Sequence, residues 1–123
     1  FLLSTKNGEP LALINDGILQ HFRVGGGAGI GAKYLSRADS EVIGLIGSGG
    51  MARTFLEAFC CVRSIKACRV YSPTNGHKES FAEEMSAKIG IEVIPVSNPR
   101  EAIAGADIVS SATDSMVPVY DAA

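Results

Sequence analysis

The sequence lacks several features that would assign it at once to a broad class of protein. No apolar run approaches the roughly 20 residues that a membrane-spanning helix needs, and the opening Phe1-Leu2-Leu3 is too short for the core of a signal peptide. The formal net charge of -2 also provides no basic stripe of the kind found in nucleic-acid-binding domains. We therefore expect neither a membrane protein nor a partner of nucleic acids.

Cysteine is scarce: the chain has three, and two of them, Cys60 and Cys61, are adjacent. Such a set does not predict a disulfide framework, so the reducing cytoplasm is the expected location. The absence of a C-x-x-C pair and the two scattered histidines argue against a zinc site. We interpret Cys60, Cys61 and Cys68 as small, buried apolar residues.

The chain does contain enough apolar sequence for one globular domain or a piece of one, since 46% of its 123 residues are hydrophobic. It begins with phenylalanine, and residues 117–121 resemble the start of a strand or loop that stops without a cap. We therefore expect a fragment of a longer protein, so that groups completing a site can lie outside this sequence.

The N-terminal third of the chain has the weaker patterns. Residues 10–15 predict a short strand, and Asp16 is a candidate cap for the segment that follows. Residues 18–35 predict a helix whose apolar side would contain Ile18, Leu19, Phe22, Ala28, Ala32 and Leu35. Five glycines among residues 25–31 weaken this prediction, because each costs up to about 1 kcal/mol in a helix interior.

From residue 41 onward, strand and helix patterns alternate. The apolar run 42–46 is typical of a strand buried on both faces, and residues 67–71, 91–96 and 107–111 predict further strands. Helices are predicted over 51–62, over 78–89 with Gly90 ending it, and from an Asn98 cap and Pro99 to Gly105, with Glu101 as the capping partner. Arg53 and Glu57 are expected on the solvent side of the first of these helices. This order predicts an α/β fold with a Rossmann-type parallel sheet.

The pattern G-x-G-x-x-A, a fingerprint for dinucleotide binding, occurs twice. It is formed once by Gly27, Gly29 and Ala32 and once by Gly47, Gly49 and Ala52. Only the second copy follows a predicted buried strand and opens a helix, as the function requires. There the glycines would permit a tight turn and the approach of a diphosphate to the helix N-terminus. A tight turn without a ligand is the alternative.

The first copy lies inside the predicted helix 18–35. We interpret it as a place where missing side chains allow close packing, and approach by a cofactor is the alternative. The segment after the second strand reads Ser72-Pro73-Thr74-Asn75 and lacks the carboxylate that usually binds the ribose of NAD. Hydroxyl groups with His77 or Lys78 nearby would tolerate a 2′-phosphate, which favours NADP(H). NAD(H) stays possible if the segment is only a β-turn.

Four segments together resemble the ornithine cyclodeaminase/μ-crystallin family. They are residues 8–16, 23–35, 42–54 and 105–109, and they contain GEPLALIND, RVG and AKYL, VIGLIGSGGMART and GADIV. The resemblance extends over nearly the whole chain. It implies a parent more than twice as long, which forms a homodimer and pairs a nicotinamide-binding domain with a substrate and dimerisation domain. Residues 1–37 would then belong to the substrate and dimerisation domain and its linking helix, and residues 38–123 to a partial Rossmann domain.

The resemblance also implies roles for individual residues. Arg23 matches the arginine that binds the substrate carboxylate, and Thr113 matches a region near the cofactor. With the fingerprint and the turn after the second strand, the predicted cofactor-binding residues are Gly47, Ser48, Gly49, Gly50, Met51, Ala52, Ser72, Pro73, Thr74 and Thr113. Val24 and Ala28 replace the usual Thr and Ser of the family. The catalytic lysine and aspartate are expected outside this chain, so Lys33 and Asp114 are not assigned to their roles.

The function implied by the resemblance is hydride exchange at the carbon of a C–N bond in an amino acid or cyclic imino acid. A cyclodeaminase returns the hydride after ammonia has left, whereas a ketimine reductase or an alanine dehydrogenase makes one transfer. The hydroxyl groups missing at Val24 and Ala28 support an alternative, an NADPH-binding μ-crystallin-like protein without turnover. The 123-residue chain alone is expected to be inactive.

Overall fold

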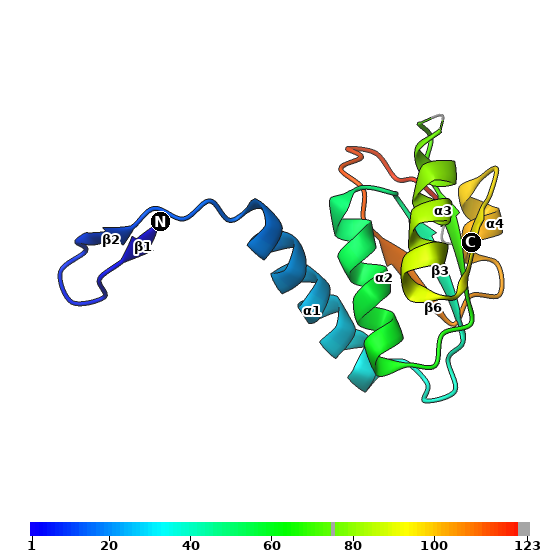
Figure 1. Cartoon of the computed structure of the whole chain (residues 1–123), viewed down its shortest axis with the longest axis horizontal. Coiled ribbons are helices and arrows are strands. Elements are labelled where there is room, and N and C mark those ends of the chain that lie inside the picture. The colour runs from blue at the N-terminus through cyan, green and yellow to red at the C-terminus, as the bar shows by residue number, and fades with distance from the viewer. Residues whose placement is uncertain (75, 121–123) are drawn as a thin grey trace.

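A computed structural model describes residues 1–74 and 76–120 (Figure 1). The elements are β1 (Leu2–Leu3), β2 (Pro10–Ala12), α1 (Gly17–Leu35), β3 (Val42–Ile46), α2 (Gly50–Val62), β4 (Ala67–Tyr71), α3 (His77–Ile89), β5 (Glu92–Pro95), α4 (Pro99–Ile103) and β6 (Ile108–Ser111). Within these residues no helix is both long and apolar enough to cross a membrane.

Four parallel strands form the main sheet in the order β5-β4-β3-β6, which confirms the predicted α/β fold of Rossmann type. The central strand β3 is apolar along its whole length because it is covered on both faces. Ile43 and Leu45 point to the side of α2 and α3, where Leu56 and Phe81 complete a core without solvent exposure. On the opposite face Gly44 makes room for α4, since a Cβ there would lie 2.5 Å from the carbonyl oxygen of Ala102.

The cysteine prediction is only partly correct. Cys68 is buried and Cys60 is half-buried, but Cys61 is exposed on the outer side of α2. Burial raises the pKa of the Cys60 thiol to about 11 and that of Cys68 to about 12. Both thiols are therefore protonated at neutral pH, as expected of residues that pack rather than react.

The N-terminal arm differs from its prediction. β1 and β2 form an antiparallel pair, and β2 ends at Ala12 rather than at residue 15 (Figure 1). Its partner β1 is only two residues long, and in the described part of the chain Leu13 and Ile14 are exposed. Asp16 occupies the N-cap position of α1, but its side chain makes no capping hydrogen bond.

Helix α1 is confirmed, but the face predicted to be buried is only partly correct: Ala32 is buried and Ala28 is half-buried, as predicted. It packs lengthwise on α2 through Gly25, Gly29 and Ala32, whereas Ile18 and Phe22 are exposed. A Cβ at Gly25 would lie 2.7 Å from Cβ of Thr54, and one at Gly29 would lie 3.0 Å from Cβ of Ala58. The glycines thus allow two helix backbones to meet, which side chains on the apolar face would prevent.

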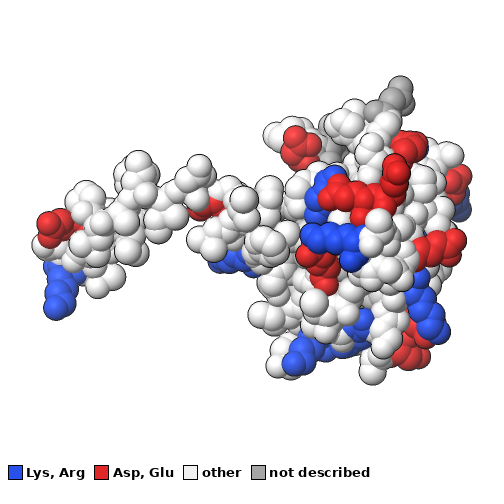
Figure 2. Space-filling model, in the orientation of Figure 1, with Lys and Arg blue, Asp and Glu red and all other residues white. Residues whose placement is uncertain are grey.

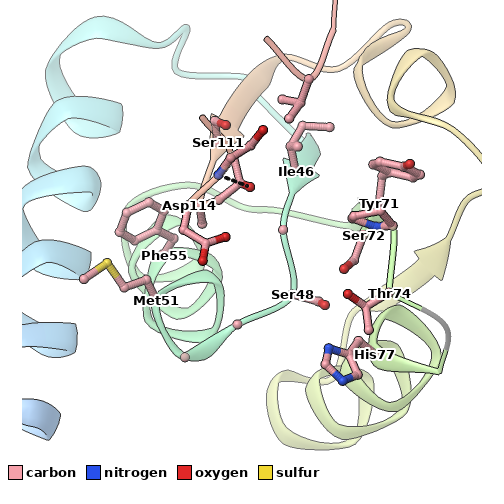
Figure 3. Close-up of a pocket in the computed structure, with 18 of the residues that line it drawn as sticks. Ile46, Ser48, Met51, Phe55, Tyr71, Ser72, Thr74, His77, Ser111 and Asp114 are labelled. Carbon is pink, nitrogen blue, oxygen red and sulfur yellow. Dashed lines mark hydrogen bonds between the residues drawn. The ribbon is translucent and has the colours of Figure 1, made fainter. Parts of the chain in front are cut away.

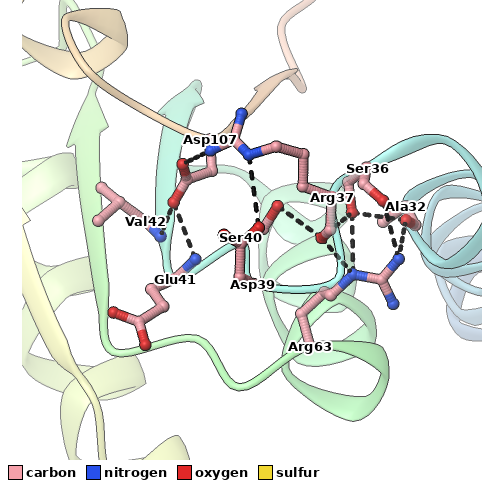
Figure 4. Close-up of polar contacts among 9 residues, drawn as sticks. All are labelled: Ala32, Ser36, Arg37, Asp39, Ser40, Glu41, Val42, Arg63 and Asp107. Carbon is pink, nitrogen blue, oxygen red and sulfur yellow. Dashed lines mark hydrogen bonds and ion pairs between the residues drawn. The ribbon is translucent and has the colours of Figure 1, made fainter.

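Two polar side chains fasten the connection between α1 and the sheet (Figure 4). The Arg63 guanidinium donates to three carbonyl oxygens at the end of α1, those of Ala32, Lys33 and Ser36, at 3.1, 2.7 and 3.0 Å. The Asp107 carboxylate accepts from the amides of Glu41 and Val42 and pairs with Arg37. These backbone amides, with Arg37, hold the pKa of Asp107 below its ordinary value.

The remaining helices mostly follow their predictions. α3 ends at Gly90, whose φ of 78° is the left-handed cap expected there. Asn98 caps α4 by accepting from the amide of Glu101 at 2.9 Å. The helix ends at Ile103, two residues before Gly105, and the Glu101 carboxylate accepts from the amide of Ser97 rather than that of the cap residue.

The charged residues of α2 form surface ion pairs with residues of α3. Arg53 pairs with Glu84, and Lys88 pairs with Glu57 at 2.6 Å. In the view of Figure 2, basic and acidic side chains therefore gather over the face formed by α2 and α3, whereas the N-terminal arm carries few charges. Two ion pairs thus join the helices that cover the core.

Candidate functional site

A pocket of about 860 Å³ lies at the carboxyl ends of β3, β4 and β6 (Figure 3). Three segments that follow these strands line it: Gly47 to Met51, Ser72 to Thr74, and Ala112 to Ser115. Parallel strands bring these segments to one edge of the sheet, where ligands of open α/β sheets bind. Every predicted cofactor-binding residue lines the pocket except Ala52, which is fully buried behind the loop and lets α2 pack closely on the sheet.

Gly47 makes the turn at the end of β3. Its φ of 102° is a conformation that favours glycine. A Cβ at this position would also overlap the carbonyl oxygen of Ala112, at the end of the neighbouring strand β6. The amide of Gly47 donates to the carbonyl oxygen of Tyr71 at 2.7 Å, which fixes the loop to β4. This glycine is therefore required by the protein itself, whether or not a ligand is present.

Gly49 and Gly50 have different surroundings. A Cβ at Gly49 would meet nothing within 4 Å, so this glycine faces the open pocket. A Cβ at Gly50 would lie 2.5 Å from Cε1 of His21, a residue of α1. Gly49 is the N-cap of α2, and among the residues that the structure describes no side chain caps this helix end. Its first amides are therefore available to an anion.

The Arg53 side chain binds the carbonyl oxygens of the loop that follows β3. Its Nη1 donates to the carbonyl oxygens of Ser48 and Gly49, at 2.9 and 3.1 Å, and its Nε donates to Glu84 at 2.9 Å. The hydrogen bond with Glu84 raises the pKa of Arg53, and the same bond lowers the pKa of the Glu84 carboxyl. Both groups therefore stay charged at neutral pH, and the loop carbonyls are tied to α2 while its amides stay available.

The two ends of the pocket differ in charge. Ser48, Ser72, Thr74 and His77 gather at one end, and Asp114 lies at the other beside Met51 and Phe55 (Figure 3). Among the described residues that line the hydroxyl-rich end, none carries a carboxylate. Lys78, considered above as a cation for this end, is engaged elsewhere, since it donates to the carbonyl oxygen of Val96 at 2.8 Å. Asn75 lies outside the described residues.

The structure does not bring every predicted site residue together. Arg23 is exposed on α1 and does not belong to the pocket lining. Thr113 does line the pocket, and its hydroxyl accepts from the amide of Ser115 at 3.2 Å. Of the first fingerprint, Gly27 has no neighbour within 4 Å and Gly29 packs on α2. The first fingerprint copy therefore serves helix packing, because its buried glycine, Gly29, lies against α2.

His21, Phe55, Tyr71 and Asp114 also line the pocket, and sequence reasoning did not assign them to the site. A signal for His21 existed. It precedes Gly25 by four residues and Gly29 by eight, so it lies on the same face of α1 as the glycines that contact α2. The prediction followed the apolar residues of α1 instead of its glycines.

Comparison with known proteins agrees with this geometry. Residues 1–122 match the ornithine cyclodeaminase/mu-crystallin family. The chain belongs to this family. Among curated members, the Delta(1)-pyrroline-2-carboxylate reductase of Bacillus cereus is 34% identical over 113 residues, which cover 92% of this chain and 35% of that enzyme. The chain therefore spans about a third of the length of the curated relatives that it matches.

Solved structures of the family share the fold. The Delta(1)-pyrroline-2-carboxylate reductase of Thermococcus litoralis, determined with NADH and L-proline, is 42% identical with a TM-score of 0.88, covering 96% of this chain and 36% of that chain. A lysine cyclodeaminase is 31% identical, also with a TM-score of 0.88, covering 98% of this chain and 36% of that one. Reductases and cyclodeaminases of this family are thus both similar to the chain.

Proposed function

We propose that the full-length protein containing this chain uses a nicotinamide dinucleotide to transfer hydride at the carbon of a C–N bond in an amino acid or cyclic imino acid. The observation that carries the proposal is the start of α2, where Gly49 leaves open space before uncapped amides. A diphosphate suits this place because the unpaired N–H groups and the helix dipole both favour an anion. The NADH bound by the Thermococcus litoralis reductase supports the same proposal.

The residues that would hold the cofactor are those of the pocket. The main chain of Ser48 to Met51 would bind the diphosphate, Ser72 to Thr74 the adenosine ribose, and Thr113 would lie towards the nicotinamide. A bound nicotinamide supplies or accepts the hydride. The chain's own contribution is to bind and orient, with Gly47 setting the turn and Arg53 holding the loop carbonyls away from the ligand.

Arg23 is proposed to bind the substrate carboxylate. Its guanidinium is exposed and forms no ion pair within residues 1–74 and 76–120, so its bidentate fork is available to a carboxylate. Arg23→Ala in the full-length protein should raise the substrate KM at least tenfold and leave the cofactor Kd nearly unchanged. Lys33→Ala is the matched control, since it removes an exposed cation from the same helix. A weaker cofactor affinity with an unchanged KM would mean that Arg23 is misassigned.

A single hydride transfer is the reaction we favour, because the sequence identity to the reductase with NADH and L-proline, 42%, exceeds the 31% identity to the lysine cyclodeaminase. In that reaction the imine carbon of a substrate such as Δ1-pyrroline-2-carboxylate takes the hydride and its nitrogen takes a proton, and one NAD(P)H is oxidised. The test is the loss of NAD(P)H absorbance with this cyclic imine. Ammonia release from ornithine or lysine without net oxidation would establish a cyclodeaminase instead.

The alternative is an NADPH-binding protein without turnover. Val24 and Ala28 are both half-buried on α1, and neither supplies the hydroxyl usual in the family. Binding of NADPH with no turnover of any imino acid or amino acid in a substrate panel would favour this alternative.

We further propose a preference for NADP(H). The described lining of the hydroxyl-rich end contains Ser72, Thr74 and His77 and no carboxylate, a composition that suits a 2′-phosphate. Fluorescence titration of the full-length protein should give a lower Kd for NADPH than for NADH. Thr74→Asp should reverse the order by restoring a carboxylate, whereas Thr113→Asp, at the other end, should not. Equal or tighter binding of NADH by the unmodified protein would end this preference.

The organisation of the full-length protein follows the same reasoning. Residues 1–37 are proposed to belong to a substrate and dimerisation domain, and residues 38–123 to the dinucleotide domain, whose sheet begins at Val42. The exposed apolar side chains of α1, among them Ile18 and Phe22, support burial of that helix in a homodimer. Free cysteines at positions 60, 61 and 68 support a cytoplasmic location.

A further inference from the structure

His21 is a residue of α1, yet it lies at the diphosphate loop. It lines the pocket together with the residues after β3. Its carbonyl oxygen accepts from the hydroxyl of Thr54 at 2.9 Å, so its main chain is fastened to the second turn of α2. The helix that precedes the sheet therefore places an imidazole beside the first residues of α2.

The imidazole occupies the space that a side chain of Gly50 would need. A Cβ at Gly50 would lie 2.5 Å from Cε1, 3.0 Å from Nδ1 and 3.2 Å from Nε2 of His21. The three atoms nearest to such a Cβ thus all belong to the imidazole ring. A Cβ at Gly50 would therefore displace the imidazole, whereas Gly49, which meets nothing within 4 Å, is left open for a ligand. These adjacent glycines of one loop therefore have different surroundings.

Neither ring nitrogen of His21 has a hydrogen-bond partner among the residues that the structure describes, although the side chain is half-buried. A neutral imidazole always carries one N–H donor, and a protonated one carries two. The neighbouring groups at the start of α2 are also donors, because their amides are uncapped. Donors from two helices that meet at one place are complementary to an anion with several acceptor oxygens.

We propose that His21 is a second contact for the cofactor diphosphate, with its imidazole N–H donating to a phosphate oxygen beside the first amides of α2. The inference rests on the proposed function and adds to it a ligand contact from α1. The cofactor would then be held by α1 and α2 together rather than by the fingerprint loop alone.

Two substitutions in the full-length protein separate contact from packing. His21→Phe keeps a flat ring against Gly50 but removes the N–H, and His21→Ala removes both. If the N–H binds the diphosphate, both variants should bind NADPH, NADH and ADP-ribose about tenfold more weakly. A His21→Phe protein that binds all three ligands as tightly as the unmodified protein would overturn the inference, because the ring would then serve only for packing.

The pairing of His21 with Gly50 gives an independent test. Gly50→Ala should push the ring away and weaken ADP-ribose binding about tenfold, and adding it to His21→Ala should cause little further loss, because the shared contact has already gone. Losses that multiply to about a hundredfold would contradict the inference. If the unmodified protein binds none of the three ligands, the proposed function itself fails, which is distinct from a failure confined to the His21 variants.

Discussion

The two glycine-rich segments of this chain match one sequence pattern and do different work. In α1, Gly25 and Gly29 are buried against Thr54 and Ala58, so the missing side chains let two helices meet. In the loop after β3, Gly47 adopts a left-handed conformation. Gly49 faces open space. What a Cβ would meet at each position therefore distinguishes helix packing from a ligand site, and the pattern alone does not.

The largest effect should come from Gly47→Ala, because this position combines both kinds of constraint. Alanine would have to adopt a φ of 102°, and its Cβ would overlap the carbonyl oxygen of Ala112. We expect the free energy of unfolding to fall by about 3 kcal/mol or more, with loss of cofactor binding. Chemical denaturation measures the first and NADPH titration the second.

Gly90→Ala is the matched control for that experiment. Gly90 also has a positive φ, of 78°, but a Cβ there meets nothing within 4 Å. Gly90→Ala should therefore lower the free energy of unfolding only by the conformational strain, about 1–2 kcal/mol, and leave cofactor binding unchanged. Equal losses of stability for the two variants would show that the contact with β6 contributes nothing.

Gly25→Ala should have the next largest effect on stability. Its Cβ would lie 2.7 Å from Cβ of Thr54 and 2.8 Å from its carbonyl oxygen, so α1 would have to move away from α2. We expect a loss of about 2–3 kcal/mol in thermal or chemical denaturation.

Its control is Gly26→Ala, one residue along the same helix. Gly26 has no neighbour within 4 Å, so alanine should stabilise the helix by up to about 1 kcal/mol. A change of the same sign in both variants would mean that the face of α1 that contacts α2 has been assigned wrongly.

Local signals explain why so much of the fold could be predicted. The strand 42–46, the cap at Asn98 and the stop at Gly90 each depend on neighbouring residues, and the structure confirms them. The glycine loop was predictable because strand, turn and helix follow one another in the sequence. All of its predicted residues but Ala52 line the pocket.

The features that were missed depend on partners distant in the sequence. Arg53 pairs with Glu84, 31 residues away, rather than lying free beside Glu57. His21 reaches the loop only because α1 packs on α2 by its glycine face. Hydrophobic periodicity could not identify that face, since glycine contributes close approach and no apolar side chain.

Gly49→Val should affect the ligand and leave the fold intact, unlike the substitutions above. The position has a φ of -80° and open space around it, so valine is tolerated by the chain itself. Its side chain would occupy the place proposed for the diphosphate, and we expect the NADPH Kd to rise at least tenfold, or about 1.4 kcal/mol. Gly49→Ala should give a smaller rise. An unchanged NADPH Kd for the valine variant would show that the diphosphate does not bind at this loop.

The smallest effect concerns the ion pair that supports the loop from α3. Glu84→Gln should weaken the hydrogen bonds from Arg53 to the loop carbonyls and raise the NADPH Kd about twofold, as expected for an exposed pair worth about 0.5 kcal/mol.

The same ion pair makes stability depend on pH. The hydrogen bond from Arg53 lowers the pKa of Glu84 below its ordinary value of 4.5, so the pair stabilises the protein above that pH. Its contribution is lost as the pH falls through the lowered pKa. Stability should therefore decline less steeply on acidification in Glu84→Gln than in the unmodified protein. Glu83→Gln, which removes a neighbouring carboxylate without a described ion pair, should change neither quantity. Identical acid profiles for the Glu84→Gln and unmodified proteins would show that Arg53 holds the loop without help from α3.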